Sequence, residues 1–323
     1  MKAIEYTTYG PTDVLQMVET EKPTPQDNEV LVRICAAGAN AADWRLMRGD
    51  PFFVRFESGL LKPKNKILGS DIAGVVEAVG SKVTHFKVGD EVFGDLSEDR
   101  LGGFAEYVCT HEAFLALKPK NLSFEEAAAV PMAAVTALQG LRDKGQIRPG
   151  MKVLINGASG GVGTYAVQIA KALGGEVTAV CSTKKIDLVR SIGADHVIDY
   201  TQENFTESSE KYDLIVAING YHPLAAYKRI LAPAGTYVCI GGEMKQIFQA
   251  MLLGPIMSKK GGVQLSSLLA KPKREDLDFV TELIETGKIM PVIDKRYSFP
   301  ETAEAIGYIE AGHAMGKVVI SVN

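Results

Sequence analysis

A glycine-rich segment carries the clearest sign of chemistry in this sequence: residues 157–163 read Gly-Ala-Ser-Gly-Gly-Val-Gly. Small residues between a strand and a helix let backbone N–H groups approach a pyrophosphate, whose charge the helix N-terminus stabilises. Gly160 and Gly163 match the second and third glycines of the G-x-G-x-x-G fingerprint, and Ala158 takes the place of the first. A tight turn with small residues for packing is the alternative. The apolar run before the segment and the helical pattern after it favour a dinucleotide site.

The segment after the next strand indicates which dinucleotide is bound. An NAD site places a carboxylate about 20 residues beyond the glycines, where it accepts hydrogen bonds from the ribose. Here the sequence has Ser182, Thr183, Lys184 and Lys185, with no carboxylate among them. Hydroxyl and ammonium groups suit a 2′-phosphate, so NADPH is preferred to NADH; the alternative is that the lysines only solvate the start of a helix. Tyr200, which closes the following strand, is placed to flank the same adenosine end; the alternative is an amphipathic tyrosine on the surface.

Metal ligands are not grouped in this sequence. A catalytic zinc site needs thiolate, imidazole and carboxylate ligands around an open coordination position. The five histidines are isolated, and none stands at a ligand-like spacing from a cysteine or carboxylate in the N-terminal part of the chain. We therefore expect no metal site. Proton transfer and stabilisation of a developing negative charge would then come from hydrogen-bond donors, water or the cofactor's ribose.

Strand and helix patterns place the glycine-rich segment inside an alternating α/β domain. Ser123 and Glu126 form a capping box before an alanine-rich helix over 127–141, where we expect the junction between domains. Beyond residue 150, strands and helices alternate, which is typical of a doubly wound parallel sheet. The expected strands are 152–156, 177–180, 196–198, 213–217 and 236–240, and the expected helices are 162–173, 185–192 and 223–231.

Short β-like runs separated by Gly, Pro and Asp occupy the first 120 residues and predict a compact β-barrel. Strand-like pieces near the C-terminus, such as 318–322, indicate that the chain returns to this first domain. The predicted division is residues 1–122 and 288–323 for the β-barrel domain and residues 123–287 for the dinucleotide-binding domain.

Composition excludes several classes of protein. The 323 residues carry a formal net charge of −4, with 46% hydrophobic and 23% charged residues, which rules out global disorder. Basic and acidic residues are interspersed, which disfavours a nucleic-acid partner. No apolar run reaches the ~20 residues that a membrane span requires, so no membrane insertion is expected. The four cysteines are scattered without a C-x-x-C pair, which fits reduced thiols and a cytoplasmic location.

A series of short motifs runs through the whole chain: Met1-Lys2-Ala3, the segments 38–44, 69–74, 88–94, 103–107 and 157–163, Gly193-Ala194-Asp195, and the segment 316–320. In this order the motifs resemble the medium-chain dehydrogenase/reductase superfamily, in its zinc-free, NADPH-dependent quinone oxidoreductase branch. Zinc-dependent relatives have a cysteine where Asn40 stands and a His-Glu pair where this sequence has Ser70 and Asp71. The resemblance implies an α/β fold with a Rossmann doubly wound parallel sheet and a GroES-like β-barrel catalytic domain that is split in sequence. It also implies a homodimer formed through the edge of the Rossmann sheet.

The resemblance assigns roles to individual residues. Asn40 would be the catalytic residue beside the nicotinamide, and Thr136 would face it from the hinge helix. The other implied cofactor-binding residues are Ser159, Gly160, Gly161 and Val162 at the pyrophosphate, Ser182, Thr183, Lys185 and Tyr200 around the 2′-phosphate, Asn219 at the ribose, and Ile240, Gly241 and Gly242 at the nicotinamide.

These observations predict an NADPH-dependent enzyme that transfers hydride to an electrophilic acceptor, a quinone or an α,β-unsaturated carbonyl compound. Without a Lewis acid, a conjugated acceptor that spreads its developing negative charge is an easier substrate than a plain ketone. Asn40 is the candidate for orienting the acceptor oxygen; alternatively, it is a turn residue that bonds its own backbone. Two other functions remain open. One is a catalytically silent NADPH-binding protein, a sensor or structural component, and the other is a zinc-free alcohol dehydrogenase.

Residues next to Asn40 are expected to have structural roles. Asp43 is placed to cap the helical turn that follows it. Trp44, Phe52, Phe53 and Phe56 are expected in the core, and the lining of an apolar acceptor pocket is the alternative.

Overall fold

The structure, a computed structural model, describes residues 1–259 and 262–322. The chain folds into two compact units. The first unit comprises residues 1–132, 272–285 and 291–323, and the second comprises residues 133–271 and 286–290. The predicted division, 1–122 with 288–323 and 123–287, places both junctions differently from these two units.

Two helices account for this difference. Helix α3 (Phe124–Ala128) packs on strand β3 (Glu29–Ala39) so closely that a Cβ atom on Gly38 would lie 2.2 Å from the Ala128 carbonyl oxygen. Helix α9 (Arg274–Glu285) is tied to the first unit by Asn121, whose Nδ2 donates a hydrogen bond of 3.0 Å to the Ile284 carbonyl oxygen. An amphipathic pattern shows that a helix has an apolar face, but it does not show which sheet that face covers.

The first unit is built on a seven-stranded sheet in the order β14-β15-β3-β4-β5-β7, with β6 also paired with β3. The C-terminal strand β15 pairs antiparallel with β3, which confirms that the chain returns to the first domain. The remaining strands are β4 (Asp71–Val79), β5 (Glu91–Asp95), β6 (Tyr107–His111), β7 (Leu115–Leu117), β14 (Ile293–Ser298), β15 (Lys317–Ser321) and a separate hairpin of β1 (Lys2–Glu5) and β2 (Gln16–Glu19).

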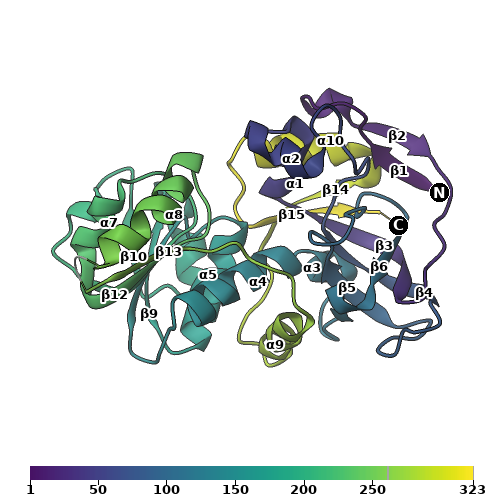
Figure 1. The fold of residues 1–323 in the computed structure, drawn as a ribbon. Coiled ribbons are helices and arrows are strands. Elements are labelled where there is room, and N and C mark those ends of the chain that lie inside the picture. The colour runs from purple at the N-terminus through teal and green to yellow at the C-terminus, as the bar shows by residue number, and fades with distance from the viewer. Residues whose placement is uncertain (260–261, 323) are drawn as a thin grey trace. The chain divides into compact units, whose positions relative to one another are not determined.

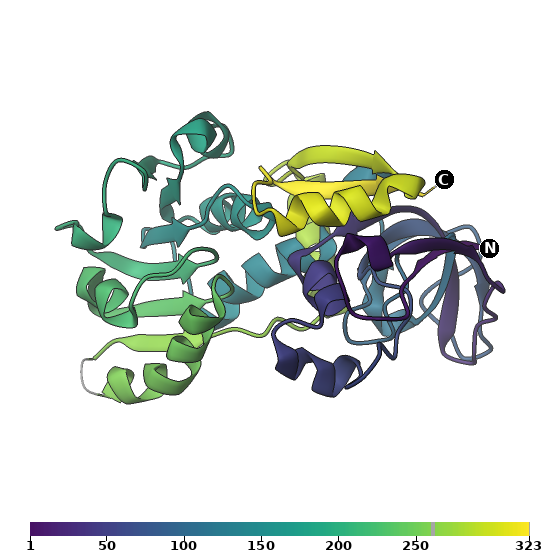
Figure 2. The same ribbon diagram turned by 90° about the horizontal axis from the view of Figure 1, so that it is seen from above.

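Helices cover parts of this sheet and complete its core. Figure 2 shows α10 (Thr302–Glu310) lying along the yellow strands β14 and β15. Helix α1 (Ala41–Arg48) follows β3 directly, and α2 (Arg55–Ser58) is a single turn further along the chain. Apolar side chains such as Ile34, Ile72 and Ile320 fill the interior and have no solvent exposure. Burial of such side chains is the main source of stability for a domain of this size.

The second unit contains six parallel strands in the order β10-β9-β8-β11-β12-β13. Figure 1 labels β9, β10, β12 and β13 of this sheet. The chain builds outward from β8 to β10 and then returns to the other side of β8 with β11. The strand order therefore reverses between β8 and β11, which confirms the predicted doubly wound sheet. The elements are β8 (Lys152–Asn156), β9 (Glu176–Cys181), β10 (His196–Asp199), β11 (Tyr212–Ala217), β12 (Leu231–Cys239), β13 (Gln264–Ser267), α5 (Gly161–Ala172), α6 (Ile186–Ser191), α7 (Leu224–Ile230) and α8 (Met244–Lys259).

Some helices differ from the sequence-based expectation. The capping box of Ser123 and Glu126 is present, but the predicted helix over 127–141 is divided into α3, α4 (Pro131–Leu138) and a π-helical segment (Gln139–Lys144). Pro131 explains the first division because it lacks a backbone N–H and starts a new helix. Helix α8 was not predicted because Gly254 and Pro255 interrupt its pattern. No helix within residues 1–259 and 262–322 is long and apolar enough to cross a membrane.

The expected core placement of three aromatic side chains is wrong. Phe52, Phe53 and Phe56 are 59%, 45% and 68% exposed. They belong to the 3-10 helix η2 (Phe52–Val54) and to α2, which are both too short to bury a continuous face. Trp44, by contrast, packs against the core of the first unit as expected.

Candidate active site

The glycine-rich segment links β8 to α5, and its glycines have different roles. Gly157 has a φ of +88°, a conformation that favours glycine. A Cβ atom on Gly163 would lie 2.1 Å from the Gly157 carbonyl oxygen, so the first turn of α5 packs directly on the end of the strand. A Cβ atom on Gly160 would meet nothing closer than that oxygen, at 3.9 Å. This open space before the α5 N-terminus fits a pyrophosphate.

The other predicted cofactor-binding residues of the second unit follow the carboxyl ends of its strands. Ser182 and Thr183 follow β9, Tyr200 follows β10, Asn219 lies shortly after β11, and residues 240–242 follow β12. Because these strands run parallel to β8 in the same sheet, the residues lie along one edge of the sheet, which also holds the glycine turn. The two remaining members are Lys185, which ends the 3-10 helix η5 (Thr183–Lys185), and Thr136 on α4.

A series of hydrogen-bonded, buried polar side chains holds the loops that follow β11 and β12. Asn156 Nδ2 donates hydrogen bonds to the Asn219 carbonyl oxygen at 2.9 Å and to Tyr227 Oη at 2.8 Å. Tyr227 Oη donates to Gln246 Oε1 at 3.3 Å, and Gln246 Nε2 donates to the Gly241 carbonyl oxygen at 3.2 Å. A satisfied buried network of this kind rigidifies the groups that it joins. Sequence reasoning missed Asn156, Tyr227 and Gln246 because their partners lie on separate elements.

A carboxylate stands beside the predicted 2′-phosphate site. Thr183 Oγ1 donates a hydrogen bond to Asp199 Oδ2, and Thr201 Oγ1 donates to Asp199 Oδ1 at 2.7 Å. These bonds hold the pKa of Asp199 below its usual range, so the group is a carboxylate at neutral pH. Sequence reasoning missed Asp199 because it ends β10, whereas Thr183 comes after β9. The negative charge of Asp199 offsets part of the positive charge that Lys185 contributes at this end of the site.

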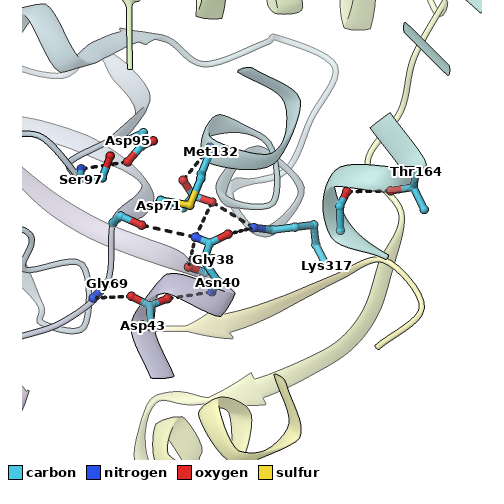
Figure 3. A network of polar contacts seen from close by, with 12 residues as sticks. Gly38, Asn40, Asp43, Gly69, Asp71, Asp95, Ser97, Met132, Thr164 and Lys317 are labelled. Carbon is cyan, nitrogen blue, oxygen red and sulfur yellow. Dashed lines mark hydrogen bonds and ion pairs between the residues drawn. The ribbon is translucent and has the colours of Figure 1, made fainter. Parts of the chain in front are cut away.

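Adjacent strands of the first unit bring three polar side chains into one row (Figure 3). Lys317 begins β15, Asn40 follows β3 and Asp71 begins β4, and the pairings Val318–Ala39 and Gly38–Asp71 set this register. Lys317 Nζ donates hydrogen bonds to Asn40 Oδ1 at 2.6 Å and to Asp71 Oδ2 at 3.0 Å. Asn40 Nδ2 donates to Asp71 Oδ2 at 2.9 Å.

Burial makes this row a closed network. The Lys317 side chain is 3% exposed and that of Asp71 is fully buried. The second oxygen of Asp71 accepts a hydrogen bond of 2.8 Å from the backbone N–H of Met132. Asn40 Nδ2 lies 3.4 Å from both Ser70 Oγ and the Gly38 carbonyl oxygen. Its bonds to Lys317 and Asp71 are much shorter than these two contacts, and Asn40 also shares the capping box at the start of α1 with Asp43, so it has the turn role that was the alternative as well.

Asp43 does not stand before the helix as predicted: α1 begins at Ala41 with Asn40 as its N-cap, and Asp43 is the third helical residue and completes a capping box with Asn40. Its carboxylate accepts hydrogen bonds from the backbone N–H groups of Asn40 at 2.7 Å and Gly69 at 3.2 Å. Burial raises the pKa of Asp43 to about 7, and burial together with the nearby Asp71 carboxylate raises the pKa of Asp95 to about 7. The Lys317 ammonium acts in the opposite direction on both groups.

A cavity of about 290 Å³ in the first unit adjoins this network. Asp43, Ser70 and Met132 belong both to the cavity wall and to the surroundings of Asn40. The rest of the wall combines apolar and polar side chains, among them Tyr6, Leu46, Leu101, Ser58, Lys64 and Asn65.

Sequence reasoning found Asn40 but missed Lys317, which stands 277 residues away. The available signal was a lysine directly before the apolar run Val318-Val319-Ile320. Within residues 1–259 and 262–322, no three His, Cys, Asp or Glu side chains gather as a set that could hold a metal ion.

Comparison with known proteins places the chain in a family. Residues 26–120 match the alcohol dehydrogenase GroES-like domain, and residues 192–320 match a domain described as zinc-binding dehydrogenase. The chain is 37% identical over 331 residues to the 2-methylene-furan-3-one reductase of Solanum lycopersicum, covering 99% of this chain and 79% of that protein. It is 35% identical over 334 residues to the chloroplastic NADPH-dependent alkenal/one oxidoreductase of Arabidopsis thaliana, with coverage of 99% and 79%.

The fold gives the same result. The structure of the quinone oxidoreductase from Coxiella burnetii matches 100% of this chain and 99% of that chain, with a TM-score of 0.89 and 29% identity. The chain therefore belongs to the medium-chain dehydrogenase/reductase superfamily, in its quinone oxidoreductase branch. This confirms the predicted family and fold, and it makes the protein an oxidoreductase that uses a nicotinamide dinucleotide.

Proposed function

We propose that the protein is an NADPH-dependent reductase of quinones or α,β-unsaturated carbonyl compounds that needs no zinc. The observation that carries this proposal is the Asn40 amide, held between Lys317 Nζ and Asp71 Oδ2. Amide and ammonium groups at this position supply hydrogen-bond donors, whereas a zinc site needs thiolate, imidazole and carboxylate ligands, and the one carboxylate of this row, Asp71, is paired with Lys317. The names of the two plant relatives, a furanone reductase and an alkenal/one oxidoreductase, support the class of acceptor.

The cofactor site of this proposal lies along the carboxyl edge of the sheet in the second unit. The open space over Gly160 and the N-terminus of α5 fit the pyrophosphate. Ser182, Thr183, Lys185 and Tyr200 surround the 2′-phosphate. The other assigned residues are Thr136, Ser159, Gly161, Val162, Asn219, Ile240, Gly241 and Gly242. NADPH, when bound, supplies the hydride.

Asn40 orients the acceptor oxygen in this proposal. One Nδ2–H bonds Asp71, and the other has neighbours at 3.4 Å, which is long for a hydrogen bond. This second N–H is therefore able to take a better acceptor. A fixed donor aimed at an oxygen that gains negative charge contributes about 10²–10³ in kcat. The adjoining cavity, with its mixture of apolar and polar side chains, suits a small conjugated carbonyl compound.

A turnover assay tests this function. The purified protein is mixed with NADPH or NADH and a panel of quinones, enones and simple ketones, with and without a chelator, and loss of reduced cofactor is followed by absorbance. We expect oxidation of NADPH by the conjugated acceptors, no effect of the chelator, and a loss of about 10²–10³ in kcat for Asn40→Ala. NADPH binding without turnover of any acceptor would indicate a silent binding protein. Metal-free, alcohol-dependent reduction of NADP⁺ without acceptor reduction would indicate an alcohol dehydrogenase.

We also propose that the protein is a cytoplasmic homodimer. Strand β13 is an edge of the six-stranded sheet, and an edge strand offers N–H and C=O groups to a second copy. All four cysteines are free thiols, which supports a reducing compartment. Sedimentation velocity at micromolar concentration should give twice the 34.8 kDa mass of the chain.

A further inference from the structure

The two charged neighbours of Asn40 accept only one orientation of its amide. An ammonium donates hydrogen bonds and has no lone pair, whereas a carboxylate accepts them and has no proton. Lys317 Nζ lies 2.6 Å from Asn40 Oδ1, and Asp71 Oδ2 lies 2.9 Å from Asn40 Nδ2. Rotating the amide by half a turn would set its N–H groups against the ammonium and its oxygen against the carboxylate. Both contacts would become repulsive, so the charged pair fixes which end of Asn40 is the donor.

We propose that Lys317 is a positioning residue that acts through Asn40, an inference that rests on the function proposed above. Lys317 fixes the orientation of the amide, with Nδ2 as its donor end. Its ammonium also draws electron density from Oδ1, and hydrogen bonds in a chain strengthen one another, so the Nδ2–H becomes a better donor. The acceptor oxygen takes the Nδ2–H whose present neighbours, Ser70 Oγ and the Gly38 carbonyl oxygen, lie 3.4 Å away.

Stability alone does not account for a lysine at this place. The three residues that follow it in β15, Val318, Val319 and Ile320, are fully buried. An apolar side chain at 317 would continue this pattern, and an ion pair in a protein interior is often no more stable than an apolar pair of similar volume. Lys317 Nζ is also closer to the uncharged amide, at 2.6 Å, than to the Asp71 carboxylate, at 3.0 Å. The ammonium thus serves Asn40 as well as Asp71.

Two lysine variants separate this role from a general effect of losing a buried charge. Lys317→Met keeps an unbranched side chain, one atom shorter, and removes its donors. Lys118→Met is the matched control, because Lys118 is also in the first unit, its side chain is 6% exposed, and it pairs with Glu91 at 3.1 Å. Both variants are compared with Asn40→Ala and with the double variant Asn40→Ala/Lys317→Met. If Lys317→Met alone does not fold, Lys317→Met/Asp71→Asn replaces it, because this pair removes both charges.

Three measurements follow: kcat and KM with an enone that the wild type reduces, the Kd of NADPH by fluorescence titration, and side-chain amide resonances after selective ¹⁵N labelling of asparagine. We expect Lys317→Met to lower kcat about 100-fold, the size of effect known for loss of one fixed donor, with the Kd of NADPH within about twofold of wild type. The double variant should be no slower than the slower single variant, because both changes remove the same interaction. Lys118→Met should keep the wild-type kcat.

The amide resonances test the inference independently of turnover. The Asn40 side-chain protons, assigned by their loss in Asn40→Ala, should shift and exchange faster in Lys317→Met and should be unchanged in Lys118→Met. Losses in kcat that multiply in the double variant, wild-type kcat in Lys317→Met, or unchanged Asn40 resonances would each overturn the role of Lys317. If the wild type reduces no acceptor, the proposed function fails, and the resonances still decide whether Lys317 fixes the amide.

Discussion

Replacing Gly160 by alanine should weaken NADPH binding without loss of stability. The residue has φ −87° and ψ −179°, which alanine adopts without strain, and the new Cβ atom would meet nothing closer than 3.9 Å. The free energy of unfolding should rise by about 0.4–1 kcal/mol, because alanine restricts the unfolded chain. The methyl group fills the space assigned to the pyrophosphate. Loss of one hydrogen bond to a charged group, about 1.5–3 kcal/mol, would raise the Kd of NADPH about 10- to 100-fold.

Gly163→Ala provides the contrast, because its methyl group would meet the protein itself. The Cβ atom would lie 2.1 Å from the Gly157 carbonyl oxygen and 2.6 Å from the carbonyl carbon of Ala158. Helix α5 would have to move away from the strand, and overpacking of this kind costs about 1–3 kcal/mol. We therefore expect a fall in Tm of roughly 3–10 °C.

Thermal unfolding by circular dichroism, with and without NADPH, and fluorescence titration of the cofactor measure both effects. Wild-type affinity for NADPH in Gly160→Ala would refute the position assigned to the pyrophosphate. A lower Tm in Gly160→Ala than in Gly163→Ala would refute the assignment of open space to the first position and close packing to the second.

Two further predictions concern acidic side chains. Asp199→Asn removes a negative charge beside Thr183 and Lys185. The KM for NADPH should therefore fall a few-fold at low salt and by less at high salt. The KM for NADH should stay unchanged, and steady-state assays measure both values. Burial raises the pKa of Asp43 to about 7, so the folded protein keeps a proton that the unfolded chain releases near pH 3.9. The free energy of unfolding should therefore fall as pH rises from about 4 to about 7, by up to about 1.4 kcal/mol per pH unit, and urea denaturation of Asp43→Asn should show a flatter profile in this window.

Features that depend on neighbouring residues in the chain were predictable from the sequence. The glycine-rich segment, the capping box at Ser123 and the strand at 152–156 all depend on residues within a few positions of one another. The alternation of strands and helices then constrains the sheet, because crossover connections between parallel strands are short and right-handed. The resemblance to a known family supplied the β-barrel and the list of cofactor-binding residues.

Features that depend on pairing between distant segments were not predictable in this way. Lys317 reaches Asn40 only because β15 pairs with β3 in one register, and a shift of one residue would turn its side chain to the other face of the sheet. The attachment of α9 to the first unit depends in the same way on the Asn121–Ile284 contact. The exposure of Phe52, Phe53 and Phe56 has a different cause, since residue type alone indicated burial.

The buried charges of the first unit explain how the amide of Asn40 is held as an oriented hydrogen-bond donor. Burial raises the pKa values of Asp43 and Asp95 to about 7, which reduces the negative charge that Lys317 must balance. Asp71 is the carboxylate in direct contact with the ammonium, so the pair is close to neutral in sum. A neutral pair leaves no strong net field to draw water or a stray cation into the site, yet its two ends still fix the Asn40 amide. In the proposed function, Asn40 therefore supplies an oriented donor through the charges of the chain, at the position where the resemblance implies a cysteine ligand in zinc-dependent relatives.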